Sequence, residues 1–84
     1  MRPKAAKALQ KIDTKNQERI KQALKRLTFD PYKAGEPLHP AQYRKIKVGD
    51  YRAIYEINQE KKEVIVLFVG HRKNVYDDFA SLLY

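Results

Sequence analysis

The sequence predicts an α+β fold: a two-helix hairpin and a short C-terminal helix packed on a small antiparallel β-sheet of three or four strands. Three observations support this prediction. Apolar residues recur at helical spacing before residue 30, two alternating runs flank Gly49-Asp50, and helical spacing returns after residue 74. The 84 residues are expected to form one domain, residues 1–84, because a chain of this length buries only one small core.

The first helix is predicted between Arg2 and Ile12. Pro3 suits its first turn, where a missing backbone N–H is tolerated. The apolar residues of this segment recur about one turn apart and share one face: Ala5, Ala8, Leu9 and Ile12.

A second helix is predicted after the break at Asp13. Thr14 and Gln17 resemble a capping box, and the helix should end before Asp30-Pro31. Its apolar stripe consists of Ile20, Ala23, Leu24 and Leu27. The short turn between the two helices predicts an antiparallel helical hairpin.

Residues 32–41 contain Gly35, Pro37 and Pro40 and are predicted to form a loop that leads to the sheet. His39 lies in this stretch without a partner residue nearby in the sequence. We therefore expect it to be an ordinary surface residue.

A β-hairpin is predicted around Gly49-Asp50, because a two-residue loop with glycine first favours a tight turn. The predicted pairs are Val48 with Tyr51, Lys47 with Arg52, Ile46 with Ala53, and Lys45 with Ile54. The two-residue period places six residues on the face toward the helices: Ile46, Val48, Tyr51, Ala53, Tyr55 and Ile57.

Lys45, Lys47 and Arg52 share the opposite face of this hairpin. Opposed like charges destabilise a strand pair, so an anion such as a phosphate is expected to lie over Lys47 and Arg52. Basic residues on the solvent face of a sheet are also common without any ligand, and this alternative stays open.

A third strand is predicted over Glu63 to Val69. Its continuous apolar run lacks alternation, which favours a central strand covered on both faces. Asn74 is a candidate cap for the last helix. The apolar face expected for that helix consists of Val75, Phe79, Leu82 and Leu83.

The composition narrows the function classes. Eighteen Lys and Arg residues against ten Asp and Glu give a formal net charge of +8, which favours RNA, DNA, ribosomes or an acidic protein as partners. There is no cysteine, and His39 and His71 lie far apart, so neither a disulfide framework nor a zinc site is expected. The longest apolar run is far shorter than the roughly 20 residues that span a membrane, and no secretion signal opens the sequence. We expect a soluble intracellular protein.

Four blocks of sequence now identify a family. Residues 4–13 read Lys-Ala-x-Lys-x-Leu-x-Lys-Ile-Asp, and Asp-Pro follows at 30–31. Residues 44–57 read Arg-Lys-Ile-Lys-Val-Gly-Asp-Tyr-Arg-Ala-Ile-Tyr-Glu-Ile, and residues 69–76 read Val-Gly-His-Arg-Lys-Asn-Val-Tyr. In this order and spacing, the chain resembles the RelE/ParE superfamily of toxins from toxin–antitoxin systems, and is more similar to its RelE branch.

This resemblance implies a cytoplasmic, ribosome-dependent mRNA interferase, the toxin of a type II toxin–antitoxin system that inhibits translation. Members of the RelE branch cleave the messenger in the ribosomal A site with the messenger's own 2′-hydroxyl group. The resemblance implies no metal or other cofactor. The implied partners are the ribosome, its mRNA and an acidic, RelB-like antitoxin that forms a hetero-oligomer with the toxin and adds to the sheet or covers the site.

The resemblance also assigns candidate site residues. The basic pair of the RelE strand corresponds to Lys45 and Lys47, and the arginine of its Tyr-Arg motif to Arg52. The remaining candidates follow the last strand: His71, Arg72 and Tyr76.

Each candidate suits one step of phosphodiester cleavage. Arg52 would hold the phosphate, Lys47 or Lys45 would act as the base, and Arg72 would stabilise the leaving oxygen or the transition state. His71 is an alternative acid, and Tyr76 can stack on a base. Structural roles are the alternatives for three residues: packing for Tyr76, a hydrogen bond at the strand end for His71, and plain solvent exposure for Lys45.

The chain differs from the family pattern at its start. Relatives begin with a strand before the first helix, whereas this sequence starts at Met1-Arg2-Pro3, so a three-stranded sheet with an unprotected edge is a further expectation. Two other functions stay open: a ParE-like inhibitor of DNA gyrase without nuclease activity, and a degenerate toxin that only binds RNA or antitoxin.

Overall fold

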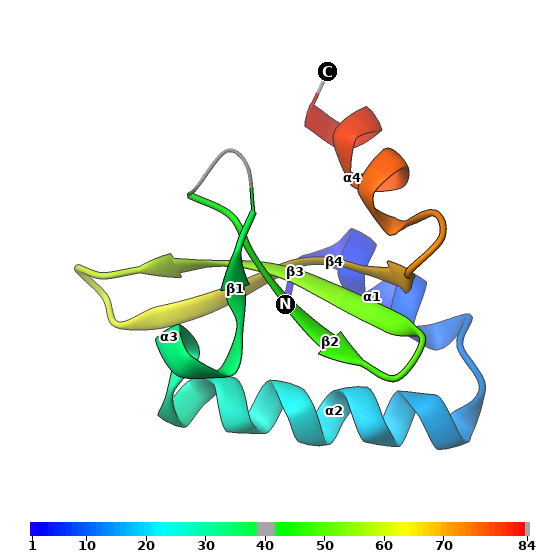
Figure 1. The fold of residues 1–84 in the computed structure, drawn as a ribbon, viewed down its shortest axis with the longest axis horizontal. Coiled ribbons are helices and arrows are strands. Elements are labelled where there is room, and N and C mark those ends of the chain that lie inside the picture. The colour runs from blue at the N-terminus through cyan, green and yellow to red at the C-terminus, as the bar shows by residue number, and fades with distance from the viewer. Residues whose placement is uncertain (39–41, 84) are drawn as a thin grey trace.

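The computed structural model describes residues 1–38 and 42–83 (Figure 1). His39, predicted to be a surface residue, lies outside this description. The elements in chain order are α1 (Pro3–Gln10), α2 (Thr14–Phe29), α3 (Pro31–Ala34), β1 (Glu36–Pro37), β2 (Arg44–Val48), β3 (Tyr51–Asn58), β4 (Glu63–His71) and α4 (Val75–Leu83).

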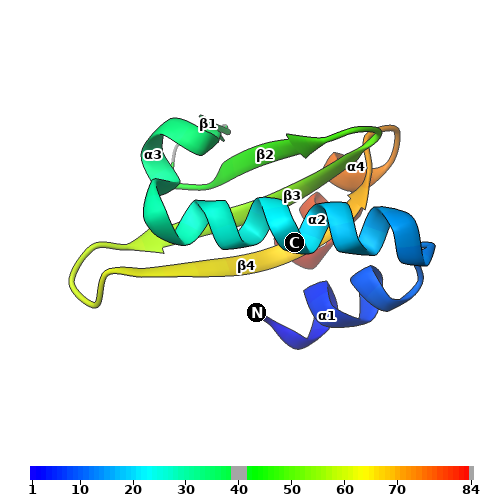
Figure 2. The same cartoon turned by 90° about the horizontal axis from the view of Figure 1, so that it is seen from below.

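The four strands form one antiparallel sheet in the order β1-β2-β3-β4. Helices α2 and α4 lie on opposite sides of the sheet (Figure 1), and α1 runs beside β4 on the side of α2 (Figure 2). The predicted α+β fold is confirmed. Within the described residues, no helix is long and apolar enough to cross a membrane.

The predicted hairpin is confirmed in every pair. Val48 lies opposite Tyr51 and Lys47 opposite Arg52, with Ile46–Ala53 and Lys45–Ile54 following in register. Gly49 has a φ of 59°, a conformation that favours glycine and allows the tight turn.

The main core lies between the sheet and the first two helices. Ile20 and Leu27 from α2 pack with Ala53 and Tyr55 from β3, and Tyr55 is fully buried. The partly buried side chains of Ile46, Val48, Tyr51 and Ile57 pack against this cluster. The face predicted from the two-residue period is therefore the buried face.

β4 is not the central strand that its apolar run predicted; it lies at the edge of the sheet. The prediction that both its faces are covered is nonetheless confirmed. Val66 and Val69 pack in the main core, while Leu67 and Phe68 contact the cluster under α4. The backbone N–H of Arg2 donates to Val66 O at 3.0 Å, so the start of α1 partly caps the edge.

The stretch predicted as a loop contains α3 and the short strand β1. Asp30 caps α3, accepting a hydrogen bond from Lys33 N, and Pro31 occupies its first turn. β1 then pairs with β2 through Glu36–Lys45 and Pro37–Arg44. The sheet thus has four strands and not the expected three, and the fourth lies on the β2 side, where two residues are too few to show an alternating pattern.

α4 covers part of the sheet face opposite α2 (Figure 1). Val75 and Phe79 are buried against a cluster that includes Ile54, and Tyr43 contacts the Phe79 ring edge-on at 5.2 Å between centroids. Leu82, predicted to share this apolar face, is instead exposed. The helix therefore leaves the sheet toward its C-terminal end.

The second helix is capped one residue earlier than predicted. Asp13 is the N-cap and accepts hydrogen bonds from the backbone and the side chain of Asn16, while Gln17 donates back to Ile12 O at 2.6 Å. Thr14 is the first helical residue. Asp13 and not Thr14 occupies the N-cap position, because a carboxylate is a stronger acceptor than a hydroxyl for the free N–H groups of the first turn.

These hydrogen bonds make the cap sensitive to pH. The Asn16 bonds to the Asp13 carboxylate lower the pKa of this carboxyl from its ordinary value of 3.8. A lowered pKa means that the stabilisation is complete above the ordinary value and is lost as the pH falls through the folded-state value. We expect the Asn16 amide to lose protection against hydrogen exchange over that window, in an acid titration followed by NMR. In Asp13→Asn, which keeps an acceptor that does not titrate, a similar loss at Asn16 would contradict this explanation.

Candidate functional site

The basic residues of the hairpin lie on the sheet face that α4 covers in part. Lys45 lies opposite Ile54, which is buried under α4, and Lys47 lies opposite Arg52. Since opposed residues share a face, Lys45, Lys47 and Arg52 form one basic surface beside α4. The side chain of Lys47 is 55% exposed, so this surface is open to a ligand.

A carboxylate joins this surface from β1. Glu36 lies opposite Lys45, and its Oε1 is 3.6 Å from Lys47 Nζ. Three neighbouring strands thus each contribute one charged side chain: the carboxylate of Glu36 from β1, and the cations of Lys47 from β2 and Arg52 from β3. We call these three residues together with Lys45 the charged face.

Groups within the chain compensate the opposed positive charges of Lys47 and Arg52. We expected an external anion over Lys47 and Arg52, yet Glu36 already supplies one to Lys47. The Arg52 guanidinium donates to Gly49 O at 2.9 Å and to Tyr51 O at 2.8 Å, so it is turned toward the hairpin end. The pair is thereby accommodated within the chain, and the opposition of charges by itself does not require a phosphate.

Tyr76 reaches the charged face from the first turn of α4. Lys45 Nζ lies 5.3 Å from the centroid of the Tyr76 ring, within the range of a cation–π contact. Tyr76 is 37% exposed, so part of the ring is also open to a ligand. The neighbouring Val75 is fully buried and fixes the start of α4 over the sheet.

Arg72 lies at the end of the hairpin, next to the turn. Its backbone N–H donates to Asp50 O at 2.8 Å, and its Nε is 3.6 Å from the Asp50 carboxylate. Arg52 is bonded to Gly49 O in the same turn. The turn therefore brings both arginines to one end of the charged face.

His71 points away from these residues. It lies opposite Tyr51, whose ring it contacts edge-on at 5.6 Å, and Tyr51 packs on the main core. Its Nδ1 accepts a hydrogen bond from Lys73 N at 3.2 Å. The sheet thus separates His71 from the other five candidate residues.

Arg44, next to the predicted basic pair, holds β1 in place. Its guanidinium donates to Tyr32 O at 2.7 Å, to Gly35 O at 3.0 Å and to the Tyr55 hydroxyl at 3.3 Å. The Tyr55 hydroxyl in turn donates to Pro31 O at 2.6 Å. This network anchors the segment that carries Glu36.

Comparison with known proteins assigns the chain to a family. The model of the ParE toxin of type II toxin–antitoxin systems matches residues 1–76. The chain belongs to the ParE toxin family. This membership confirms the resemblance to the RelE/ParE superfamily. A search of curated protein sequences gave no significant match.

A solved structure supports the same assignment. The toxin is similar to a chain in the crystal structure of the RelBE2 toxin–antitoxin complex from Mycobacterium tuberculosis, with a TM-score of 0.77 and 28% sequence identity. The match covers 84% of this toxin and 91% of that chain. It confirms the RelE-like fold.

One residue of the charged face was missed from the sequence. Glu36 stands between Gly35 and Pro37, in a stretch whose glycine and prolines predicted a loop. A strand of two residues is too short to show a two-residue period. Its proximity to Lys47 depends on the pairing of β1 with β2, which only the folded toxin reveals.

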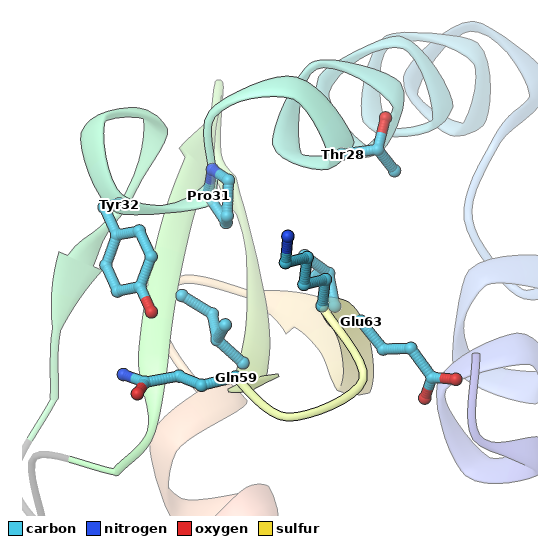
Figure 3. A pocket seen from close by; sticks show the side chains of 8 residues that line it. Thr28, Pro31, Tyr32, Gln59 and Glu63 are labelled. Atoms are coloured by element: carbon cyan, nitrogen blue, oxygen red, sulfur yellow. The ribbon is translucent and has the colours of Figure 1, made fainter.

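A cavity of about 470 Å³ lies elsewhere in the toxin, between the end of α2 and the turn that joins β3 to β4 (Figure 3). Thr28, Pro31 and Tyr32 line it from the helical side, and Gln59 and Glu63 from the sheet side. None of the charged-face residues lines this cavity. We therefore place the candidate site on the charged face.

Proposed function

We propose that this toxin is a ribosome-dependent mRNA endonuclease of the RelE type. The observation that carries the proposal is the charged face, where a carboxylate and three cations from three adjacent strands lie beside an exposed tyrosine. A phosphodiester carries charge on its nonbridging oxygens, and cationic side chains stabilise the additional charge that develops during cleavage.

The reaction begins with the messenger's own 2′-hydroxyl group. Glu36 accepts its proton, and the 2′-oxygen attacks the adjacent phosphorus to form a 2′,3′-cyclic phosphate. A carboxylate is ordinarily ionised at neutral pH and can accept a proton at once, whereas a lysine must first lose one. Glu36 therefore replaces Lys47 and Lys45 as the proposed base.

The cations complete the reaction. Lys47 and Arg52 hold the nonbridging oxygens, for which Arg52 exchanges its carbonyl partners in the turn for the phosphate. The Lys45 ammonium gives a proton to the leaving 5′-oxygen, and Arg72 stabilises its charge. Arginine does not give up a proton in proteins, so Lys45 is the better acid. Tyr76 stacks on a base of the messenger.

The net charge of +8 supports binding to the ribosome, because it attracts the phosphates of ribosomal RNA. A ribosome-bound toxin acts in the cytoplasm. Its proposed inhibitor is an acidic, RelB-like antitoxin that forms a hetero-oligomer with it. The RelBE2 structure, a toxin–antitoxin complex, supports such a partner.

The test is primer extension on mRNA loaded onto ribosomes. We expect reverse-transcription stops within A-site codons for the wild-type toxin. Arg52→Ala should reduce their rate of formation by about 100-fold, because one preorganised phosphate donor is lost. Lys25→Ala, which removes an exposed cation from α2, is the control and should keep full cleavage. Stops that form at the wild-type rate in Arg52→Ala would remove Arg52 from the proposed site.

The second candidate is inhibition of DNA gyrase, which the match to the ParE family model favours. A supercoiling assay with purified gyrase distinguishes the two functions. Loss of supercoiling without any mRNA stops would replace the nuclease proposal. A folded toxin that is inactive in both assays and binds RNA with a steep salt dependence would be a degenerate RNA-binding toxin.

A further inference from the structure

Three consecutive carbonyl groups of the turn between β2 and β3 accept hydrogen bonds from two arginines. Gly49 O and Tyr51 O accept from the Arg52 guanidinium at 2.9 Å and 2.8 Å. The carbonyl between them, Asp50 O, accepts from Arg72 N at 2.8 Å. The turn backbone therefore fixes the guanidinium of Arg52, but it fixes only the main chain of Arg72.

The register of the sheet places Asp50 and Arg72 on the charged face. The ladder of β3 and β4 pairs Arg52 with Gly70. The hydrogen bond from Arg72 N to Asp50 O continues the same register two residues further along. Side chains two positions apart on a strand share a face, so Asp50 and Arg72 return to the face of Arg52. They form an opposed pair of unlike charges at its end.

The Asp50 carboxylate is the group that restrains the Arg72 side chain. Arg72 Nε lies 3.6 Å from Asp50 Oδ1, an ion-pair distance. Within residues 1–38 and 42–83, no other carboxylate forms an ion pair with Arg72. The Arg72 side chain is 55% exposed, and a long exposed side chain samples many rotamers unless a partner restrains it.

We propose that Asp50 is a positioning residue, which holds Arg72 beside Arg52 so that both guanidinium groups reach the same phosphodiester. This role rests on the proposed nuclease function. The carboxylate lies at Nε, so the two terminal amino groups of Arg72 stay available to the leaving oxygen. Asp50 itself neither gives nor takes a proton in the reaction; it acts through Arg72.

The turn by itself does not require a carboxylate at position 50. Gly49 supplies the positive φ that the tight turn needs. Asparagine is favoured in turns for the same reasons as aspartate. Asparagine would therefore serve the turn equally well, and what Asp50 adds is its negative charge.

The position of Asp50 predicts opposite effects on binding and on rate. Its charge repels the phosphates of RNA, so its removal should strengthen the attraction between the site and its substrate. The same removal releases the Arg72 guanidinium from its place, which should slow the chemical step. A residue that only maintained the fold would weaken binding and rate together.

The experiment is single-turnover cleavage on mRNA-loaded ribosomes over a series of ribosome concentrations, which separates the maximal rate from the half-saturating concentration. Asp50→Asn should lower the maximal rate by about 10-fold, with an unchanged or lower half-saturating concentration. Asp50→Glu keeps a carboxylate and should recover part of the rate. Arg72→Gln should lose about 100-fold, because a donor to the developing charge is removed.

The double variant decides whether Asp50 acts through Arg72. Adding Asp50→Asn to Arg72→Gln should cost at most about twofold more, since the residue that Asp50 holds is already gone. The matched control is Glu60→Gln, which removes one exposed carboxylate from the turn between β3 and β4 and should cleave as the wild type does. Asp50→Asn should also unfold at nearly the wild-type temperature, because an exposed ion pair contributes little stability.

A second readout does not depend on cleavage. In the full-length toxin labelled with ¹⁵N-arginine, NMR relaxation should show the Arg72 Nε–H to be more ordered than that of Arg26, an exposed arginine of α2. In Asp50→Asn, the Arg72 Nε–H should become as mobile as that of Arg26.

Two results would overturn the proposal: an equal loss of rate from Asp50→Asn in the wild type and in Arg72→Gln, or an Arg72 Nε–H that Asp50→Asn leaves unchanged. The first would show that Asp50 acts on the reaction independently of Arg72. A folded wild-type toxin that does not cleave would instead overturn the nuclease function, and the NMR comparison would still decide whether Asp50 holds Arg72.

Discussion

Replacing Glu36 with glutamine is expected to lower the rate of mRNA cleavage by about 10²- to 10⁴-fold, the usual contribution of a general base. Glutamine keeps the size and the hydrogen-bonding capacity of the side chain but cannot accept the 2′-hydroxyl proton. RNA binding should be retained or strengthened, because Lys47 loses its internal carboxylate partner and becomes free for the phosphate.

The measurement combines single-turnover cleavage on programmed ribosomes with RNA binding by the same variant. Glu36→Asp should recover part of the rate, since it restores a carboxylate one methylene shorter. Glu60→Gln, in the exposed turn between β3 and β4, is the control and should cleave as the wild type does. Cleavage by Glu36→Gln at or above the wild-type rate would show that Glu36 only pairs with Lys47, and the base would have to be sought elsewhere.

Replacing Gly35 with alanine is expected to destabilise the fold by about 3 kcal/mol, at the upper end of the usual cost of overpacking. A Cβ at this position would meet the Tyr55 hydroxyl and would lie 2.7 Å from Lys45 O. The φ of −125° suits alanine, so the cost is steric and not conformational. For a chain of this size, the midpoint of thermal unfolding should fall by about 12–24 °C.

Two variants separate the causes of this effect. Tyr55→Phe removes the hydroxyl that donates to Pro31 O and should cost about 1–2 kcal/mol by itself. In the double variant with Gly35→Ala, the closest clash is gone, so the combined loss should be smaller than the sum of the two single losses. Strict additivity in thermal and denaturant unfolding would contradict the steric explanation.

Gly35→Ala should also disturb the charged face. Gly35 precedes Glu36, and β1 approaches β2 closely at this point. A displaced β1 would move Glu36 away from Lys47. We therefore attribute the glycine to the close approach of the Tyr55 side chain and the β2 backbone, whereas the sequence predicted only a loop here.

The parts of this toxin that depend on local period and turn chemistry could be predicted before its structure was known. The register of the hairpin, its buried face and the positions of the main helices follow from alternation, helical spacing and one turn glycine. Short sequence motifs in the same segments also identified the superfamily. These features are encoded in neighbouring residues, so they can be read before the chain is folded.

Contacts between residues far apart in the chain could be found only in the folded protein. The tertiary structure placed β4 at the sheet edge, set His71 against the Tyr51 ring and brought Glu36 to Lys47. Such contacts depend on strand order and on where a short strand stops, which are set by the packing of the whole chain. A local sequence pattern cannot predict these contacts, because the two residues in each contact are far apart in the sequence.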